Sequence, residues 1–216
     1  MYKRQIQPEL AIRDNSGNLV TDSTLIVSAT VSGRTMVGTS SRPAVGGVTS
    51  FVGLGIEGTV ATELVIRYAT VTLAGATLET IQTIELTAGT AVKLSIVEQP
   101  ATVKRKTSFT NDVAVQLLDE FDNPVHTDSS SIITAKLFSK SMQEATQIDG
   151  SSLSVMRATA STGRATFSGL TLPVAPDTGY TLRFYLGSAV LISDQFTVLA
   201  GNVATVSITL QPSSVI

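Results

Sequence analysis

The sequence predicts an all-β chain, and three observations carry the prediction. Val, Ile and Thr are abundant, and the 3.6-residue periodicity of amphipathic helices is absent. Runs of alternating apolar and polar residues end in bends rich in Asp, Asn and Gly, the residues typical of turns. The plan of one bend, Asp119 to Val125, also occurs earlier, at Asp14 to Val20. We therefore expect one β-domain that is written more than once.

The composition limits both the size and the partners of the protein. At 216 residues and 43% hydrophobic content, the chain can form two domains that each have a core. A formal charge of −2 with 15% charged residues does not provide the basic field that nucleic acids require. The chain has no cysteine, which excludes disulfides, thiolate metal sites and cysteine nucleophiles.

No run is apolar and long enough to be the core of a signal peptide or a membrane span. We therefore expect no membrane insertion in this segment. If the protein is extracellular, we expect this sequence to be part of a longer chain.

The first copy contains a series of strand-like runs separated by turn residues. These runs alternate between apolar and polar positions or are rich in β-branched residues, as half-buried strands are. The expected strands are 8–13, 24–31, 48–51, 62–73 and 76–86, with a Ser/Gly/Pro-rich loop at 39–47 and a hairpin turn at 73–76.

The second copy follows the same plan after a boundary near Thr87-Ala88-Gly89. Its expected strands are 92–97, 112–118, 132–138, 163–170, 179–185 and 190–198, with a polar loop at 143–154 and a hairpin turn at 186–188.

The repeat can be checked by arithmetic. Asp14 corresponds to Asp119 at an offset of 119 − 14 = 105, and Phe51 corresponds to Phe167 at 167 − 51 = 116. The offset grows where loops accept insertions. The join between copies recurs as well, because Gln99-Pro100 reappears as Gln211-Pro212, as do the Ala-Gly and Ser-Ile pairs before it.

This arithmetic predicts the domain organisation. We expect a first domain over residues 1–88 whose N-terminal strand is missing, since nothing before residue 8 resembles the run at 92–97. We expect a second domain over 89–200. Residues 201–216 then form the first strand of a third repeat.

Short strands, regular turns and a closing hairpin in a unit of about 110 residues fit an immunoglobulin-like β-sandwich. The antibody pattern of paired cysteines around a tryptophan is absent, since the chain has neither residue type. The second copy contains Val113-x-Val115-x-Leu117-x-Asp119-x-x-x-Asn123-Pro124-Val125, Gly163-x-Ala165-Thr166-Phe167-Ser168-Gly169-Leu170 and Gly179-Tyr180-Thr181-Leu182. In these residues it resembles the bacterial-type immunoglobulin-like repeats of invasin- and intimin-like surface proteins, and the first copy matches them more loosely. The resemblance implies tandem immunoglobulin-like β-sandwiches in a large cell-surface polypeptide.

No residue pattern predicts catalysis. His126 is the only histidine, so a proton relay has a single candidate, which we interpret as a surface loop residue. Asp119, Glu120 and Asp122 crowd one turn and would not flank a substrate as glycosidase carboxylates do. We expect no catalytic residue, no cofactor and no enzymatic activity.

The bend at Asp119, Asp122 and Asn123 leaves two interpretations open. Their oxygens are ligands that calcium prefers, and a calcium site there would make the protein a calcium-stiffened adhesin rod. The same residue types also cap backbone N–H groups in turns. We favour the turn, because the equivalent bend of the first copy has one carboxylate, Asp14.

These points predict a non-catalytic structural or adhesive repeat segment of an extracellular stalk, filament or adhesin at the cell surface, which acts as a spacer and an interaction surface. The expected partners are neighbouring immunoglobulin-like repeats of the same polypeptide, and other surface proteins or glycans are further candidates. The alternative is a carbohydrate-binding module accessory to a secreted enzyme. That module needs an exposed aromatic platform, whereas this chain has no Trp and 5% aromatic residues.

Overall fold

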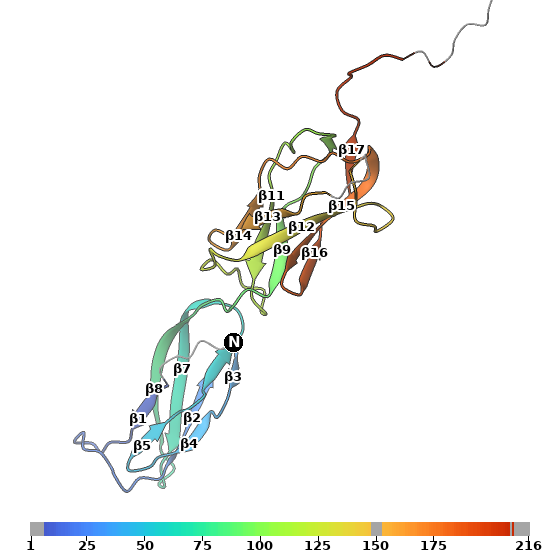
Figure 1. Ribbon diagram of the computed structural model, residues 1–216. Helices are drawn as coiled ribbons and strands as arrows, with labels where there is room; N and C mark the ends of the chain where they lie inside the picture. Colours follow the sequence, from blue (N-terminus) through green and yellow to red (C-terminus); the bar gives the residue numbers. More distant parts are fainter. Residues whose placement is uncertain (1–6, 148–152, 208, 210–216) are drawn as a thin grey trace, which may run out of the picture. The chain divides into compact units, whose positions relative to one another are not determined.

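A computed structural model describes residues 7–147, 153–207 and 209, and within these ranges the chain forms strands and no helix (Figure 1). The strands are short, as the turn-rich sequence predicts. Their bounds are β1 Glu9–Ala11, β2 Ile26–Val31, β3 Thr35–Val37, β4 Ser41–Pro43, β5 Val48–Ser50, β6 Gly55–Glu57, β7 Ala61–Val71, β8 Thr77–Leu86, β9 Lys93–Glu98, β10 Val103–Lys104, β11 Val113–Leu118, β12 Ile132–Phe138, β13 Met156–Thr159, β14 Arg164–Phe167, β15 Asp177–Leu186, β16 Ala189–Ile192 and β17 Phe196–Leu199.

The chain divides into two compact units. The first comprises Met1–Lys93 and Leu117–Thr127, and the second comprises Leu94–Gln116 and Asp128–Ile216. The bend after β11 thus belongs to the first unit. The domain limits that the repeat arithmetic gives, 1–88, 89–200 and 201–216, remain predictions.

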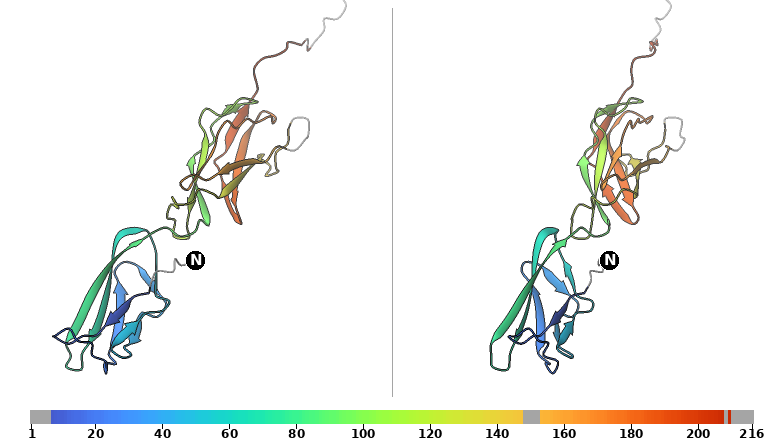
Figure 2. Two further views of the ribbon diagram at one scale, coloured as in Figure 1. Left: turned by 60° about the vertical axis from the view of Figure 1, so that its left-hand side comes forward. Right: turned by 90° about the vertical axis from the view of Figure 1, so that its left-hand side faces the viewer.

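The first unit has two main sheets. β4, β2, β7 and β8 form one in that order, and β1 pairs with β5 in the other; β3 and β6 form a further ribbon. Figure 2 shows β7 and β8, coloured cyan to green, running side by side as one long hairpin. The core between the sheets contains Val27, Ala29, Phe51, Ile66 and Tyr68.

The strand order of the second unit is immunoglobulin-like. One sheet has the order β14-β11-β9, and the other has the order β10-β17-β15-β12-β13, with β16 also on β15. The sheet β14-β11-β9 corresponds to the A, B and E strands of an immunoglobulin sandwich, and the other sheet contains the counterparts of the C, F and G strands. The run predicted at 92–97 is β9, which completes the three-stranded sheet, and this expectation is confirmed.

The pairing registers of the two units are the same. Leu10 lies opposite Thr49 in the first unit, and Val115 lies opposite Ala165 in the second. These pairs are related by the offsets of 105 and 116 that the sequence predicts. Because a one-residue slip would turn every side chain to the other face, the shared register shows that both copies use the same inward-facing positions.

An aromatic pair joins the two sheets of each unit at the same place. The ring centroids of Phe51 and Tyr68 are 5.7 Å apart, and those of Phe167 and Phe184 are 5.4 Å apart. Both pairs are tilted, which avoids face-to-face repulsion between the rings. The sandwich core is therefore duplicated in detail, and the predicted fold class of tandem immunoglobulin-like β-sandwiches is confirmed.

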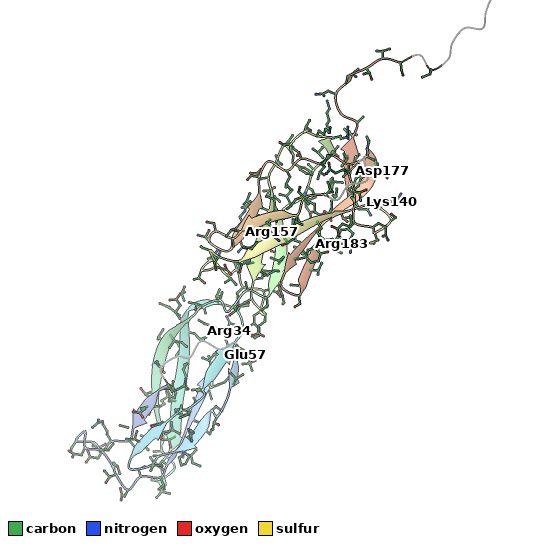
Figure 3. The ribbon with its side chains drawn as sticks, viewed as in Figure 1. Arg34, Glu57, Lys140, Arg157, Asp177 and Arg183 are labelled. Atoms are coloured by element: carbon green, nitrogen blue, oxygen red, sulfur yellow. The ribbon has the colours of Figure 1, made fainter. Side chains whose placement is uncertain are left out.

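Tyr180 supplies a second immunoglobulin feature. Its hydroxyl, near the start of β15, donates a 2.8 Å hydrogen bond to the carbonyl of Ala175, five residues upstream, as in a tyrosine corner. Burial, with the negative charge of Asp177, raises the pKa of the hydroxyl, so it stays a donor at neutral pH. Figure 3 labels Asp177 near this corner and Arg183 further along β15, where its guanidinium lies 3.8 Å from the Phe138 ring centroid.

The prediction of a loop over residues 39–47 is wrong. Residues Ser41–Pro43 form β4, and the four residues between this strand and β5 contain a two-residue turn that a bridge between Val45 and Val48 closes. Gly46 and Gly47 have φ angles of 60° and 79°, the positive values that a type I′ hairpin turn requires. The two glycines therefore shape a tight turn.

The strand predicted at 190–198 is interrupted. β16 and β17 flank Ser193, whose buried hydroxyl accepts a hydrogen bond from Leu182 N–H at 2.9 Å and donates one to Asp194 O at 2.8 Å. The predicted loop at 143–154 carries no strand where it is described, and its residues 148–152 lie outside the described ranges.

Residues 201–207 and 209 form no strand, and their side chains are exposed. The strand expected over 203–210 falls partly on residues outside the described ranges, so it remains a prediction. The described part of the chain contains no helical segment with the length and apolar character of a transmembrane span.

A buried hydroxyl in the first unit gives a stability prediction. Thr49 has no exposed surface, and its Oγ1 has no hydrogen-bond partner. The equivalent position in the second unit is Ala165. Thr49→Val replaces the hydroxyl with a methyl group of similar size, so we expect about 1 kcal/mol of added stability. Chemical denaturation measures it; Thr49→Ser, which keeps the hydroxyl and loses the methyl, should destabilise instead, and a less stable Thr49→Val protein would disprove the idea.

Candidate functional site

One carboxylate holds the bend between β11 and β12. Oδ1 of Asp119 accepts hydrogen bonds from the backbone N–H groups of Phe121 and Asn123, each at 2.9 Å. Oδ2 accepts two more at 2.9 Å, from the Asn123 side-chain amide and from the Gly89 N–H. Asp119 is only 3% exposed. Four N–H donors therefore replace the water that an ionised carboxylate would otherwise bind.

The first copy builds the same bend. Oδ1 of Asp14 accepts hydrogen bonds from the N–H groups of Ser16 and Asn18, each at 2.9 Å. The Asn18 side-chain amide donates to Oδ2 at 3.0 Å. In both copies the Asp N–H also donates to the Asn carbonyl, at 2.9 Å in the first and 3.0 Å in the second. An Asp and an Asn four residues apart thus form a repeated turn lock.

These hydrogen bonds change the acidity of the carboxyl groups. Burial raises the pKa of Asp119, but the hydrogen bonds from the Asn123 side chain and from the Gly89, Asn123 and Phe121 N–H groups outweigh it, so the pKa lies below its ordinary value. The Asn18 side chain likewise lowers the pKa of Asp14. Both bends are therefore held by ionised carboxylates at neutral pH.

Asn123 makes further contacts within the first unit. Its side-chain amide donates to Gly58 O at 3.1 Å, and its Oδ1 accepts from Val60 N–H at 2.9 Å. The side chain is buried, so all these groups are paired with protein. Asn123 therefore joins the bend to the segment between β6 and β7.

Asp122 is arranged differently. It has a positive φ of 62°, and its Oδ1 accepts a 2.8 Å hydrogen bond from the Lys93 ammonium. Both side chains are largely exposed, so the ion pair contributes little stability. Lys93 also donates to Glu120 O at 2.9 Å.

The three candidate calcium ligands lie together as the sequence predicts, but their oxygens face N–H groups. Both oxygens of Asp119 accept N–H donors, Asn123 Oδ1 accepts Val60 N–H, and Asp122 faces a lysine. Within the described ranges, no group of three or more His, Asp or Glu side chains is placed to hold a metal ion. This arrangement is that of a turn lock; the response to calcium remains a prediction, tested below.

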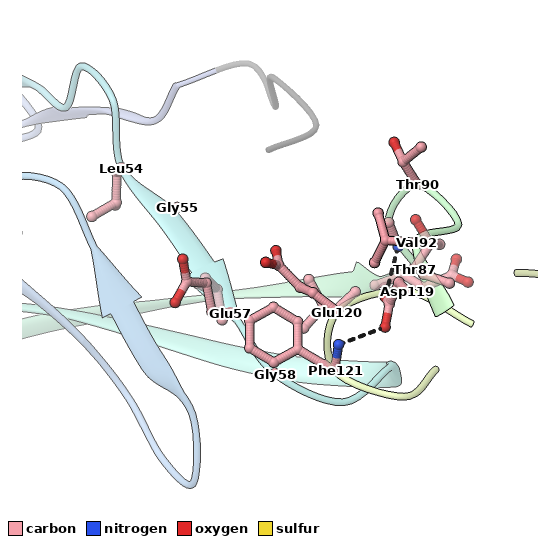
Figure 4. A pocket seen from close by; sticks show the side chains of 15 residues that line it. Leu54, Gly55, Glu57, Gly58, Thr87, Thr90, Val92, Asp119, Glu120 and Phe121 are labelled. Atoms are coloured by element: carbon pink, nitrogen blue, oxygen red, sulfur yellow. Dashed lines mark hydrogen bonds between the residues drawn. The ribbon is translucent and has the colours of Figure 1, made fainter. Parts of the chain in front are cut away.

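A hollow of about 180 Å³ lies beside the bend in the first unit (Figure 4). Phe121 and Glu120 line it from the bend, and Glu57 lines it from β6. Figure 4 shows the Phe121 ring facing this hollow, with its backbone N–H on the Asp119 carboxylate. Its lining mixes carboxylates and backbone with a single ring, which gives no arrangement of acid, base and nucleophile.

The remaining catalytic candidate lies apart from these groups. His126 is exposed on the segment that follows the bend, as expected of a surface loop histidine. Asp119, Glu120 and Asp122 occupy one turn, as predicted. That the protein is not an enzyme remains a prediction.

Sequence reasoning missed two residues of the bend. Gly89 and Lys93 lie 30 and 29 residues from their partners Asp119 and Asp122, so no local pattern connects them. The signal that could have found Gly89 is its recurrence, since Ala88-Gly89 returns as Ala200-Gly201 at the next join.

No protein-family model matches the chain, and no curated protein matches it. Solved structures that resemble it include a β-glucuronidase of Parabacteroides merdae, at 15% identity and a TM-score of 0.31, covering 82% of this chain. The chain spans 21% of the length of that enzyme.

Two tandem-domain structures are also similar. The Ig1-2 module of the Drosophila receptor protein tyrosine phosphatase DLAR has 12% identity and a TM-score of 0.23, covering 88% of this chain and 87% of the module. The titin domains Z1Z2, in complex with telethonin, have 11% identity and a TM-score of 0.26, covering 82% and 83%. The immunoglobulin-like assignment rests instead on this chain's own strand order and tyrosine corner.

Proposed function

We propose that this chain is a non-catalytic structural segment of tandem immunoglobulin-like repeats, of the kind found in invasin- and intimin-like surface proteins, and that it serves as an extracellular spacer and interaction surface. The observation that supports it best is the duplicated turn lock. Asp14 with Asn18 and Asp119 with Asn123 direct their polar groups to each other and to the backbone of their own bends. A chain that repeats a stabilising device instead of a ligand site is built to be long and stable.

The strands set the length that each repeat contributes. β7 has 11 residues, which at about 3.3 Å per residue span roughly 36 Å. Its antiparallel pairing with β8 runs from Val71 to Ala61 with one irregularity. Each further sandwich would add a similar increment, so a longer array of such repeats would reach proportionally further.

Labelling tests the location. An antibody against the second unit should stain intact cells that produce the natural protein as strongly as permeabilised cells. Staining that requires permeabilisation would refute the extracellular assignment. A known cytoplasmic protein, stained in parallel, reports whether the cells are intact.

Binding tests separate the spacer from the carbohydrate-binding alternative. On a glycan array we expect no saturable binding by the purified chain, because the aromatic side chains that pair in its cores are buried. Saturable binding to one class of glycan, lost in Phe121→Ala and kept in Val52→Ala, would favour the carbohydrate-binding module instead.

Calcium distinguishes the turn lock from a calcium-stiffened rod. We expect millimolar calcium to leave the melting temperature unchanged relative to a chelator, because N–H donors surround the Asp119 carboxylate. A calcium site would add about 2.7 kcal/mol at a hundredfold excess over its dissociation constant. Calorimetry measures this; a rise of several degrees that Asp122→Asn abolishes would establish the metal site.

A further inference from the structure

In the first unit, one face of the larger sheet is exposed to solvent. The sheet has the order β4-β2-β7-β8, and on β7 the side chains of Leu64, Ile66 and Tyr68 are buried, so the residues between them face away from the core. The pairing registers extend this alternation to the neighbouring strands. We call this surface the first outer face. It consists of the even-numbered positions of β2 and the odd-numbered positions of β4, β8 and, from residue 63 on, β7.

The first outer face is acidic and partly apolar. Arg67 forms an ion pair with Glu79 at 2.9 Å. An irregularity in the β7–β8 pairing places two β7 residues, one of them Glu63, opposite Glu85, so both carboxylates lie on this face. One arginine and three glutamates give a charge of 1 − 3 = −2. Three aliphatic side chains of the same face are more than half exposed: Ile26, Val71 and Ile81.

The corresponding sheet of the second unit also has an exposed face. Ile133, Ala135 and Leu137 of β12 are buried, so the even-numbered residues of this strand face outward. The pairing registers place the odd-numbered positions of β13, the even-numbered positions of β16 and the odd-numbered positions of β15 from residue 181 on beside them. These positions form the second outer face.

The second outer face has the opposite charge. Its described strand positions include Lys136, Arg157 and Arg183 and no carboxylate; Figure 3 labels the two arginines. Glu144 pairs with Lys136 at 3.0 Å, so the charge is 3 − 1 = +2. Three aliphatic side chains of this face are also more than half exposed: Ile132, Val190 and Ile192.

One of these arginines is held in place by its own unit. The guanidinium carbon of Arg183 lies 3.8 Å from the centroid of the Phe138 ring, and its Nη2 donates to Sδ of Met142 at 3.1 Å. A guanidinium that is already ordered loses less conformational entropy when it binds a carboxylate. Arginine, methionine and aromatic residues are also enriched in protein interfaces, and Tyr185 lies on the same strand and face.

The two outer faces are the same surface of the repeated sandwich. Ile26 corresponds to Ile132 at 132 − 26 = 106, and Arg67 corresponds to Arg183 at 183 − 67 = 116. Each face has one internal ion pair, an excess of two charges and exposed aliphatic side chains, so the main difference is the sign of the charge. Two like faces would repel each other, whereas a first and a second outer face attract.

We propose that the first outer face of one copy of this chain packs on the second outer face of another copy, so that the protein associates with itself through its sheet faces. The contact is heterologous, so it joins the copies either as a reciprocal pair or as a continuing series. The inference goes beyond the proposed spacer role and requires no particular cellular location, so it can fail independently of that role.

The smaller face limits the strength of the contact. β12 has 7 residues, which at about 3.3 Å per residue span roughly 23 Å, and four strands about 4.8 Å apart span roughly 19 Å. Two such faces would bury about 900 Å² together, which is below the range of about 1,200–2,000 Å² that stable complexes bury. We therefore expect reversible association at high protein concentration.

A matched pair of charge reversals tests the contact in the full chain. Sedimentation velocity of the wild type should show association that increases with protein concentration and decreases with added salt. Arg157→Glu cancels the excess charge of the second outer face, since 2 − 2 = 0, and should weaken association about tenfold. Arg164→Glu makes the same change at an exposed residue of β14, in the other sheet, and should change association less than about threefold. A wild-type chain that stays monomeric, or equal effects of the two variants, would overturn the proposal.

Mixing two variants of opposite charge tests which faces meet. Glu63→Lys with Glu85→Lys gives a chain with two basic faces, and Lys136→Glu with Arg157→Glu gives a chain with two acidic faces. Neither variant should associate with itself, whereas an equimolar mixture should form heteromers. Melting temperatures close to that of the wild type establish that both variants are folded. If folded variants fail to associate when mixed, or if either associates with itself as the wild type does, these faces are not the contact.

Discussion

Asp119→Ala is expected to lower the free energy of unfolding by about 3 kcal/mol, which is more than the effect expected of Asp122→Ala in the same bend. The substitution removes an acceptor of four hydrogen bonds and leaves buried N–H groups of Asn123 and its neighbours unpaired. Each buried N–H group that loses its acceptor costs about 1–3 kcal/mol. N–H groups at the edge of the bend can hydrogen-bond to water instead, which reduces the total loss. Chemical denaturation of the full chain measures the loss.

Two variants control for this result. Asp122→Ala changes an exposed carboxylate in the same turn, whose ion pair with Lys93 should contribute below about 1 kcal/mol. Asp119→Asn keeps one acceptor oxygen and should fall between the other two. Equal effects of Asp119→Ala and Asp122→Ala would mean that the hydrogen bonds of the buried carboxylate do not hold the bend.

The same carboxylate makes stability depend on pH. Because the folded-state pKa of Asp119 lies below its ordinary value, its contribution is fully present above the unfolded-state pKa, near 4, and is lost as pH falls through the lower folded value. Asp14 and Asp128 have lowered pKa values too, so they contribute with the same sign. The difference in stability between wild type and Asp119→Asn should therefore shrink as the pH falls below about 4. A constant difference would exclude this linkage.

The sequence predicted the longer strands and their equivalence because each has a regular pattern. The two offsets that the sequence gives, 105 and 116, relate the pair Leu10–Thr49 to the pair Val115–Ala165, and the structure pairs both in the same register. The short strands β3, β4, β6, β10 and β13 have two to four residues each, too few to show an alternation. Their position is set by the strands beside them.

Some features of the turns and of the bend have no local signal in the sequence. Thr162 occupies a left-handed position, φ 48°, where the first copy has Gly46, so only the glycine carries a recognisable signal. At the bend, the Asp-Asn spacing predicted the capping hydrogen bonds within the turn. The Gly89 contact was not predictable from local pattern, because tertiary folding brings it to Asp119 from 30 residues away.

Phe184→Ala is expected to cost about 3–5 kcal/mol, the largest effect of any substitution considered. Phe184 is fully buried in the second unit, and its ring lies 5.4 Å from that of Phe167. Removing the ring loses its transfer energy and leaves a cavity between two sheets that cannot fully collapse. A unit of this size should lose at least about 12 °C in melting temperature, which calorimetry of the full chain measures.

The equivalent substitution in the first unit makes this a test of domain organisation. Tyr68 occupies the position of Phe184, packs on Phe51 and donates to Gln82 at 2.9 Å. If each sandwich has its own core, Phe184→Ala should lower one calorimetric transition and Tyr68→Ala the other, while Phe184→Leu shifts its transition less. One transition that falls with both alanine variants would refute the prediction that residues 1–88 and 89–200 are separate domains, because it would show that the two cores unfold as one.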